Sequence, residues 1–326
     1  MKLPRRTFLR LASGVAALPA VSGFAGAQAY PARAVKFILP FGPASGVDIT
    51  ARLFADRLAA RWGKPVVVEN RPGGEGLIAI GAFVNANDDH TLLFSPVGTF
   101  AVHPYGQEKL PYNAERDLQP IASVSTILLA VSISESLKVG SLAELVALAR
   151  AQPGKLNAAA ANGVTDFLLF GFLKETGLRM AKVPYRDMTQ ALNDLAEGRI
   201  QVLMASLAVM QPQMQTGRIK VVGVTSRARA PIVPDIPTVI ETGYPALAMD
   251  GLVGLFGPRG MARDVRERIA SDLQAIAAAD AVIVGRLAAT GQIVDVRGPA
   301  EFAAGIEEQR ATLAAIAKTL DIKSTQ

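Results

Sequence analysis

Short apolar runs alternate along the chain with amphipathic stretches from Val35 onward. Such alternation of strand-like and helix-like segments predicts an α/β fold whose sheets are mainly parallel. The predicted strands are Val35–Leu39, Val66–Val68, Thr91–Phe94, Ile127–Ile133, Asn157–Ala161, Val183–Tyr185, Gln201–Ala205, Lys220–Thr225 and Leu252–Phe256.

The helix-like stretches carry apolar positions at helical spacing and recognisable ends. In the first of them, five apolar residues at i, i+3, i+4, i+7 and i+11 share one face, as expected of a helix packed on a sheet. These residues are Ala51, Phe54, Ala55, Leu58 and Trp62. Ser141 and Glu144 form a capping box that predicts a helix over Leu142–Ala151, ended by Pro153-Gly154.

The last part of the chain, from Ala262, holds three helical patterns. Gly291 suits the end of the second pattern, because glycine is favoured just beyond a helix C-terminus. Pro299 suits the start of the third, because proline fits the first turn of a helix.

Two segments are candidates for crossings between domains, one around Ser125–Thr126 and one over the proline-rich stretch Pro231–Pro245. A chain that leaves one α/β lobe and later returns to it forms a two-segment hinge, and a cleft between lobes is a usual ligand site. We therefore predict a first lobe made of residues 30–126 and 250–326, and a second lobe made of residues 127–249.

Composition restricts the chemistry that the protein can perform. Its 326 residues are 50% hydrophobic and 19% charged, and they include no cysteine and two histidines, His90 and His103. Disulfides, thiolate metal sites and cysteine nucleophiles are therefore excluded, and histidine chemistry has little to draw on. Both histidines stand in polar or turn-like stretches, which predicts surface or loop positions. We expect no metal and no catalytic residue.

The net charge of +6 is concentrated near the N-terminus. Residues 1–29 hold four basic residues and no acidic one, so 30 Lys and Arg face 28 Asp and Glu in the remainder. That balance lacks the dense basic face that phosphate binding requires, so we expect no nucleic-acid partner.

Residues 1–29 have the pattern of an export signal, with a basic start, an apolar centre and cleavage sites near Ala27 or Ala29. The apolar stretch is too short to span a membrane. Arg5-Arg6 also resembles a twin-arginine motif, which implies export of a folded protein, although an ordinary secretion signal or a retained amphipathic tail has a similar pattern. We predict a periplasmic protein without direct membrane insertion after signal removal.

The stretch Pro40–Asp48 is a loop of small residues between a predicted strand and a predicted helix. Such a loop exposes backbone N–H groups at a helix N-terminus, where the helix dipole also favours an anion. One interpretation is a cradle for a carboxylate. The other is a plain turn in which Asp48 caps the helix, and the spacing alone does not separate the two.

Motifs of other function classes are incomplete. Gly74–Ala79 matches a dinucleotide fingerprint, but the acidic residue required after the next strand is absent, and Pro72-Gly73-Gly74 is explained by a turn that opens a helix. Residues 30–326 also lack a Gly-x-Ser-x-Gly elbow, a His-Glu-x-x-His pair and a loop of clustered acids. We therefore predict no cofactor.

Three further junctions between predicted strands and helices carry small or polar residues. They are Ser95–Phe100, Ala160–Asp166 and Tyr185–Met188. In parallel sheets such junctions meet at the carboxyl ends of the strands, where ligands bind. Their agreement, rather than any one of them, indicates a ligand site.

These segments together resemble the Bug family of periplasmic solute receptors, which serve tripartite tricarboxylate transporters. The resemblance covers Tyr30 to about Lys323 in order, and its most specific blocks are Val66–Gly73 (Val-Val-Val-Glu-Asn-Arg-Pro-Gly) and Pro234–Thr238 (Pro-Asp-Ile-Pro-Thr). It implies a type II periplasmic-binding-protein fold, with two α/β lobes that close on a small organic acid. It also implies membrane transporter subunits as partners, and we predict a monomer.

The resemblance also assigns the ligand contacts, largely through backbone N–H groups of the junction loops. Carried over by position, the first-lobe residues are Phe41, Pro43, Ala44, Ser45, Gly46, Val47, Asp48, Ser95, Val97, Gly98, Thr99 and Phe100. The second-lobe residues are Ala161, Asn162, Gly163, Thr165, Asp166, Tyr185, Arg186, Asp187 and Ser206.

The chain departs from the family pattern at several of these positions. Relatives commonly have glycines at Ala44 and Ser45, Ser-Ser-Gly at Ala159–Ala161, a hydroxyl residue at Asp166 and glycine at Asp187. Two carboxylates near the site need a cationic partner or water, and Arg186 is a candidate partner. They predict a ligand with both a carboxylate and a cationic or donor group, such as an amino acid, unless both point into solvent.

Two other functions remain open at this point. A signalling receptor of the same fold, reporting its ligand to a membrane sensor, has the same pocket. A hydrolytic enzyme needs a nucleophile or base that these residues do not supply.

Overall fold

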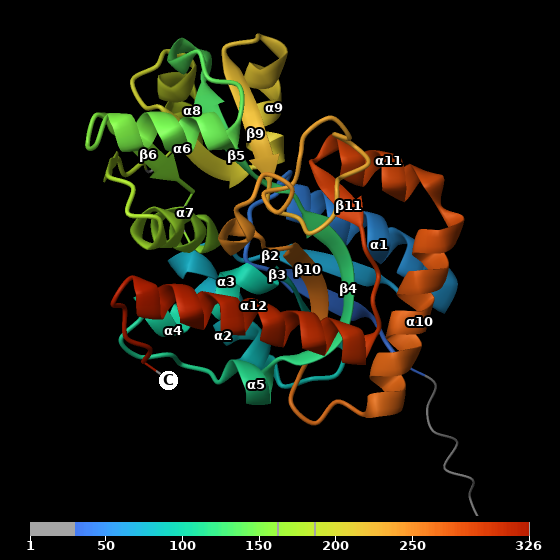
Figure 1. Cartoon of the computed structure of the whole chain (residues 1–326). Helices are drawn as coiled ribbons and strands as arrows, with labels where there is room; N and C mark the ends of the chain where they lie inside the picture. Colours follow the sequence, from blue (N-terminus) through green and yellow to red (C-terminus); the bar gives the residue numbers. More distant parts are fainter. Residues whose placement is uncertain (1–29, 162, 186, 326) are drawn as a thin grey trace, which may run out of the picture. The chain divides into compact units, whose positions relative to one another are not determined.

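The computed structural model describes residues 30–161, 163–185 and 187–325. The export signal predicted in residues 1–29 and the candidate contacts Asn162 and Arg186 lie outside the described residues. Residues 33–326 form one unit that contains two β-sheets (Figure 1).

The first sheet has six strands in the order β11-β4-β10-β3-β1-β2. β1 pairs in parallel with β2 and β3, whereas β10 runs antiparallel to β3 and β4, and β11 antiparallel to β4. The strands are β1 (Val35–Leu39), β2 (Val66–Asn70), β3 (Thr91–Pro96), β4 (Gln119–Ile127), β10 (Gly251–Gly257) and β11 (Gln292–Val294).

The second sheet has five strands in the order β7-β6-β8-β5-β9. β6 is parallel to β7 and β8, and β5 is antiparallel to β8 and β9. The strands are β5 (Leu129–Ser134), β6 (Leu156–Ala160), β7 (Met180–Lys182), β8 (Val202–Ser206) and β9 (Ile219–Val224).

The α/β class is confirmed, but the expectation of mainly parallel sheets is wrong. The antiparallel pairs are those of β4, β5, β9, β10 and β11. Four of these five strands flank the two passages of the chain between the sheets, at Leu128 and between Val224 and Gly251. A strand that enters from the other sheet comes without a helical crossover and therefore need not run parallel to its new neighbours.

Two strand predictions also need correction, and two strands were missed. β4 and β11 were not predicted, and the run Ile127–Ile133 combines the end of β4 with β5. The run Val183–Tyr185 lies beyond β7, which ends at Lys182. Hydrophobic alternation cannot show where a strand ends when apolar residues continue into the adjoining loop.

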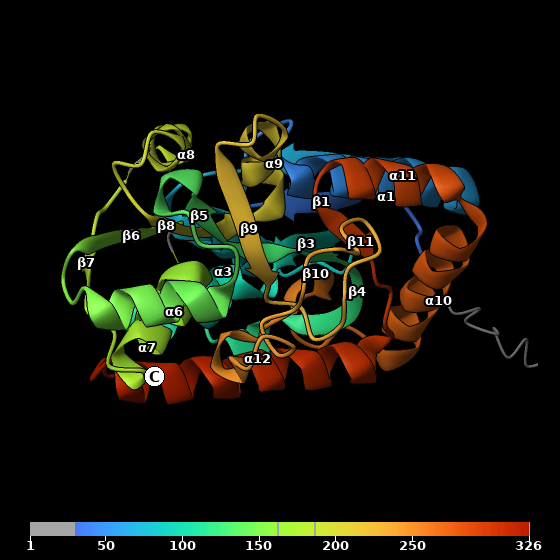
Figure 2. The same cartoon turned by 45° about the horizontal axis from the view of Figure 1, so that its top comes forward.

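Helices cover both faces of each sheet (Figure 2). For the first sheet, α1, α10 and α11 contact one another on one face, and α2, α3 and α12 lie on the other. For the second sheet, α8 and α9 lie on one face and α6 and α7 on the other. The bounds are α1 (Gly46–Trp62), α2 (Leu77–Ala86), α3 (Val97–Ala101), α4 (His103–Gly106), α5 (Ala114–Asp117), α6 (Leu142–Ala151), α7 (Val164–Glu175), α8 (Met188–Ala196), α9 (Leu207–Gln215), α10 (Arg263–Ala279), α11 (Ala281–Ala289) and α12 (Pro299–Thr319).

The helix signals in the sequence are confirmed at several ends. Ser141 Oγ accepts from the Glu144 N–H at 3.2 Å and begins α6, and α12 begins at Pro299. On α1, the four predicted core residues up to Leu58 are buried. Trp62 is only half-buried, and its indole N–H donates to Asp272 Oδ2 at 2.7 Å.

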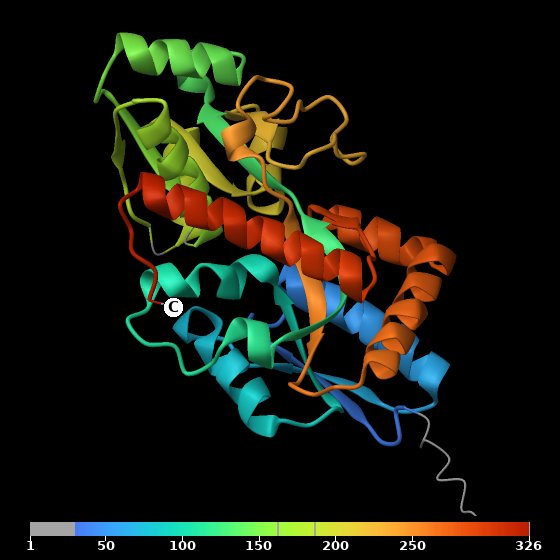
Figure 3. The same cartoon turned by 60° about the horizontal axis from the view of Figure 1, so that its bottom comes forward.

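One hydrophobic cluster joins the two sheets on the side of α12. It includes Phe83 of α2 and Phe302 of α12 together with Leu145 of α6 and Phe172 of α7. α12 packs against both α7 and β4 (Figure 3). The C-terminal helix therefore belongs to the packing of both sheets, although its predicted lobe is the first. The lobe boundaries stay a prediction.

Across the part of the chain that the structure describes, helices long and apolar enough to cross a membrane are absent.

Candidate functional site

A cavity of about 690 Å³ lies between residues of the two sheets. Its size is in the range of small-molecule sites. The loops after β1 and β3 of the first sheet and after β6 and β8 of the second contribute to its lining, as does the passage Met249–Leu252. The four loops all follow the carboxyl ends of strands, which is where ligands bind in α/β sheets.

The loop between β1 and α1 contributes Phe41, Ser45, Gly46 and Val47 to the lining. Ser45 is the N-cap of α1, and its Oγ accepts from the Asp48 N–H at 3.2 Å. The predicted contacts Pro43 and Ala44 are exposed and Asp48 is buried, and these three residues do not line the cavity. The first residues of α1 thus line the cavity, whereas Asp48 does not.

Asp48 holds this loop from inside the protein. Its Oδ2 accepts from the Ala44 N–H at 2.9 Å, its Oδ1 accepts from Asn70 Nδ2 at 2.8 Å, and Arg52 Nε donates to both oxygens. Asn70 Nδ2 also donates to the Phe41 carbonyl at 2.9 Å. The two sequence blocks that contain Asp48 and Asn70 therefore bind each other.

The charge of Asp48 is stabilised by these contacts. Burial alone raises the pKa of a carboxyl group, but the hydrogen bonds from Arg52, Asn70 and the Ala44 N–H outweigh burial and hold the pKa of Asp48 below its usual value. Asp48 is therefore ionised at neutral pH, with its charge directed to the loop. Neither interpretation of the sequence described this arrangement, because Ser45 rather than Asp48 is the N-cap.

α3 begins directly after β3, and this junction contributes Gly98 and Thr99 of α3 to the lining. The other predicted residues of the junction, Ser95, Val97 and Phe100, are buried and do not line the cavity. Phe100 instead packs edge-to-face on Phe256, with ring centroids 5.3 Å apart.

The loop between β6 and α7 contributes Ala161, Gly163 and Thr165 to the lining. Asp166 does not line the cavity, and its Oδ2 accepts from Lys182 Nζ at 2.9 Å. The other oxygen of Asp166, Oδ1, is buried without a hydrogen-bond partner among the described residues. Lys182 thus supplies a cation to Asp166 within the protein.

Tyr185 and Asp187 also lie outside the cavity lining. The Tyr185 hydroxyl donates to Asp194 Oδ2 at 2.7 Å, and burial together with Asp194 raises the pKa of Tyr185 to about 12. Asp187 is exposed and caps α8, with Oδ1 accepting from the Thr189 N–H at 2.8 Å.

Ser206, the last residue of β8, lines the cavity and is the N-cap of α9. No side chain among the described residues accepts from the first turn of α9 or α7. The first N–H groups of a helix have no acceptor within the helix and carry its positive dipole end. Both helices therefore offer first-turn donors without a capping side chain beside the cavity.

Among the described residues that line the cavity, none is Lys, Arg or His, and the charged ones are Glu75 and Asp250. The sequence did not predict either as a contact. Glu75 stands in the turn Gly74–Gly76 before α2, at a φ of 54°. The predicted turn that opens a helix is confirmed here. The signal that could have identified Glu75 as a cavity residue is the position of this turn, directly after the strand β2.

His103 supports the turn that carries Glu75. Its Nε2 lies 3.0 Å from the Glu75 carbonyl and its Nδ1 2.6 Å from the Tyr112 hydroxyl. Burial lowers the pKa of His103, so a neutral ring can donate to the carbonyl through Nε2 and accept from Tyr112 through Nδ1. The prediction of a surface or loop histidine is wrong for His103, which is buried in α4. His90 is buried as well, but it lies in the turn before β3, which agrees with a loop position.

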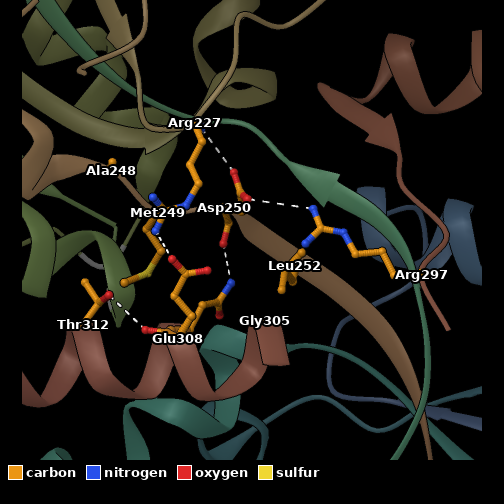
Figure 4. Close-up of a pocket in the computed structure, with 10 residues that line it drawn as sticks. Arg227, Ala248, Met249, Asp250, Leu252, Arg297, Gly305, Glu308 and Thr312 are labelled. Carbon is orange, nitrogen blue, oxygen red and sulfur yellow. Dashed lines mark hydrogen bonds and ion pairs between the residues drawn. The ribbon is translucent and has the colours of Figure 1, made fainter. Parts of the chain in front are cut away.

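A second, much smaller pocket of about 10 Å³ adjoins the cavity and shares Asp250 with it (Figure 4). The Asp250 carboxylate lies between Arg297, whose Nη2 is 3.9 Å away, and the Arg227 N–H, at 3.4 Å. Arg227 also forms an ion pair with Glu308 of α12. The space suits about one water molecule. Its charges satisfy one another, so the larger cavity is the candidate ligand site.

The described residues contain one group with metal-binding side chains, Asp88, Asp89 and His90. Arg33 Nη2 lies 2.5 Å from Asp88 Oδ1, and His90 Nδ1 lies 2.6 Å from Asp89 Oδ1. The group is engaged in its own ion pairs and precedes β3, at the end of the strand opposite the cavity loops.

Comparison with known proteins establishes the family of the chain. A family model described as "Tripartite tricarboxylate transporter family receptor" (TctC) matches residues 50–315. The chain belongs to this family.

Individual proteins are also similar to most of the chain. A UPF0065 protein in the tcbD-tcbE intergenic region of Pseudomonas sp. (strain P51) is 31% identical over 260 residues, which are 78% of this chain and 77% of that protein. BugT of Bordetella pertussis (strain Tohama I) is 31% identical over 238 residues, 72% of this chain and 73% of BugT. Among solved structures, Rpa4515 of R. palustris with adipate is 26% identical, with a TM-score of 0.74, covering 90% of this chain and 99% of Rpa4515. The predicted family and the predicted periplasmic-binding fold are confirmed.

Proposed function

We propose that this TctC receptor is exported to the periplasm, binds a small carboxylic acid in the 690 Å³ cavity, and presents it to a tripartite tricarboxylate-type transporter. The observation that carries the proposal is the set of N–H donors at the start of α1, α7 and α9 beside a cavity whose described lining contains no cationic side chain. Such donors bind an anion without a lysine or arginine. Rpa4515, which was solved with adipate, supports a carboxylate ligand.

In this proposal the ligand is held by suitably placed backbone N–H donors and is not chemically changed. The α1 donors stand on a loop held by Asp48, and the α7 and α9 donors come from the second sheet. A ligand that contacts the α1 donors and the second-sheet donors together stabilises the conformation in which these two groups of donors are close. The size of this stabilisation is set by how much more tightly the ligand binds that conformation than the one in which they are apart. The protein acts as a receptor and not as an enzyme.

The ligand in our proposal also carries a cationic or hydrogen-bond-donating group, as an amino acid does. Glu75 supports this, because it lines the cavity as a carboxylate that accepts from the uncharged Gln107 side chain, at 3.3 Å. Asp166 and Asp187, on which the sequence-based expectation rested, contribute less, because Lys182 and the α8 N–H groups already engage them. Glu75 is an exposed side chain, so a cationic group on the ligand would pair with it in place of water.

The test is thermal-shift screening of the purified protein with citrate, malate, adipate, glutamate and benzoate, together with native mass spectrometry for a small molecule that co-purifies. We expect stabilisation by at least one carboxylate, with glutamate above the others. Stabilisation by citrate and none by glutamate would overturn the zwitterion assignment. Failure of all five, with no co-purifying acid, would overturn the carboxylate-receptor function.

A further inference from the structure

The segment Thr290–Gln292 leads from α11 into the first residue of β11, and it contacts both α1 and α9. Gln292 lines the cavity and is 1% exposed. Its Nε2 donates to the Gly46 carbonyl at 2.9 Å and to Thr290 Oγ1 at 3.0 Å. Its Oε1 accepts from Ser125 Oγ at 2.8 Å. Thr50 Oγ1 lies 3.3 Å from Oε1, but its one proton has a nearer acceptor in the Gly46 carbonyl, at 2.8 Å. Both amide protons and one acceptor position of Gln292 are therefore used, which fixes which end of its amide faces Gly46.

The contact with Gly46 orients a donor of the candidate site. Gly46 is the first residue of α1, and its carbonyl belongs to the same planar peptide group as the Val47 N–H. In a trans peptide the two point in opposite directions, so a side chain that holds the carbonyl also sets the direction of the N–H. The Val47 N–H is among the first-turn donors that lack a helical acceptor. Gln292 thus acts on the ligand through the peptide group of α1.

Gly291, the preceding residue, contacts the second-sheet donors. A Cβ at Gly291 would lie 2.8 Å from Ala208 N and 3.2 Å from Ala208 Cβ, so the first turn of α9 approaches as closely as it does because Gly291 has no side chain. The Gly291 carbonyl accepts from the Leu128 N–H at 3.1 Å, and the Leu128 carbonyl accepts from the Leu207 N–H at 2.8 Å. The chain passage at Leu128 therefore lies between Gly291 and α9.

We propose that Gln292 and Gly291 are positioning residues for ligand binding, which hold the first turn of α1 and the first turn of α9 at the separation where both sets of donors reach one carboxylate ligand. The inference rests on the proposed function. It adds the segment that links the donors of α1 to the donors of α9. Gln292 acts through Gly46, and Gly291 acts by leaving room for Ala208.

Gln292→Glu tests the first half with a side chain of the same shape. The variant replaces an N–H donor to the Gly46 carbonyl by a carboxylate oxygen, which repels that carbonyl and adds negative charge beside an anion site. The probe is the member of the five-compound panel that stabilises the wild-type protein most, and its affinity is measured by titration calorimetry. At pH 8 we expect at least a tenfold loss of affinity.

The pH dependence separates positioning from a general structural effect. When the carboxyl group introduced by Gln292→Glu is protonated, its hydroxyl can donate to the Gly46 carbonyl, so the loss relative to wild type at pH 5 should be smaller than at pH 8. In the protein without probe, hydrogen exchange of the amides of residues 46–49 should be faster in the variant. A loss that is equal at both pH values, with unchanged exchange, would contradict the role of Gln292.

Gly291→Ala tests the second half, and Gly63→Ala is its matched control. Both glycines are left-handed, with φ of 66° and 64°, so both variants carry similar backbone strain. An added Cβ meets Ala208 at position 291 and meets nothing within 4 Å at position 63. We expect at least a tenfold loss of probe affinity in Gly291→Ala and less than a twofold change in Gly63→Ala.

The outcomes separate this inference from the proposed function. If the wild-type protein binds none of the five compounds and carries no co-purified acid, the proposed function fails and the inference fails with it. If the wild-type protein binds a probe and both Gln292→Glu and Gly291→Ala bind it as the wild type does, the inference alone is overturned.

Discussion

The two sides of the cavity present backbone donors in different ways. On the side of the first sheet, the loop before α1 is held by Asp48, Asn70 and Gln292, whose side chains bind one another or the loop backbone. On the side of the second sheet, α7 and α9 begin without a capping side chain among the described residues. The first side is held by the protein's own side chains. The second side has first-turn donors without a side-chain acceptor, although the Leu207 N–H of α9 already donates to the Leu128 carbonyl.

This difference teaches how a receptor can bind an anion without a cationic side chain. Preorganised donors lower the cost of binding, because the loop does not have to be ordered by the ligand. Donors without a capping side chain add favourable binding free energy only when the ligand contacts them. In our proposal the first side gives the receptor its initial affinity, and the second side favours the bound arrangement.

The largest effect is expected from Asp48→Ala. Removing this buried carboxylate leaves the Ala44 N–H without its acceptor and leaves Asn70 with only the Phe41 carbonyl, and we expect the free energy of unfolding to fall by about 3 kcal/mol. Chemical denaturation measures it. The control is Asp187→Ala, which removes an exposed cap and should cost about 1 kcal/mol. Equal decreases in the free energy of unfolding of the two variants would contradict the conclusion that the contacts of Asp48 stabilise the loop before α1 more than an ordinary helix cap would.

The next largest effect is expected from Ser206→Asp, at the N-cap of α9. Aspartate caps a helix well, so stability should stay the same or rise, but its charge competes with a ligand anion for the α9 donors. We expect at least a tenfold loss of affinity for the best carboxylate probe, or about 1.4 kcal/mol. Ser206→Asn, which caps without charge, should lose less. Undiminished binding by Ser206→Asp would place the ligand away from α9.

A smaller, pH-dependent effect sharpens the account of the first side. The pKa of Asp48 is lowered in the folded protein, so its stabilising contribution is complete above the unfolded pKa of about 3.9 and is lost as the pH falls through the lower folded value. Unfolding measured between pH 6 and pH 2 should show a shallower acid loss in Asp48→Asn than in the wild type. Superimposable profiles would contradict the assigned charge state.

The smallest effect is expected from Ala44→Gly. Ala44 has a φ of 63°, a left-handed conformation that glycine adopts without strain. The relief is partly offset by the greater freedom of glycine in the unfolded chain, so we expect a gain of about 0.5 kcal/mol. Ala147→Gly on the exposed face of α6 should instead lose about 1 kcal/mol. A loss at Ala44 would contradict a strained loop.

The site could be predicted from the sequence only where neighbouring residues decide it. Ser45, Gly46 and Val47 line the cavity because a short loop of small residues leads from a strand into a helix, and that transition is visible in the local pattern. Asp166 and Asp187 were expected at the site from their positions in similar loops. Their partners, Lys182 and the Thr189 N–H, depend on where each side chain turns, which the pattern of the loop does not specify.

The chain by itself therefore determined the α/β class, the helix starts at Ser141 and Pro299, and the family, since these depend on spacing and on contiguous motifs. Only the tertiary structure decided the antiparallel passages between the sheets and the contact of Gln292 with Gly46, which are 246 residues apart. The physical reason is the distance along the sequence over which each interaction acts. Capping and amphipathic spacing act within a few residues, whereas a buried amide is satisfied by whichever donors and acceptors the folded chain brings beside it.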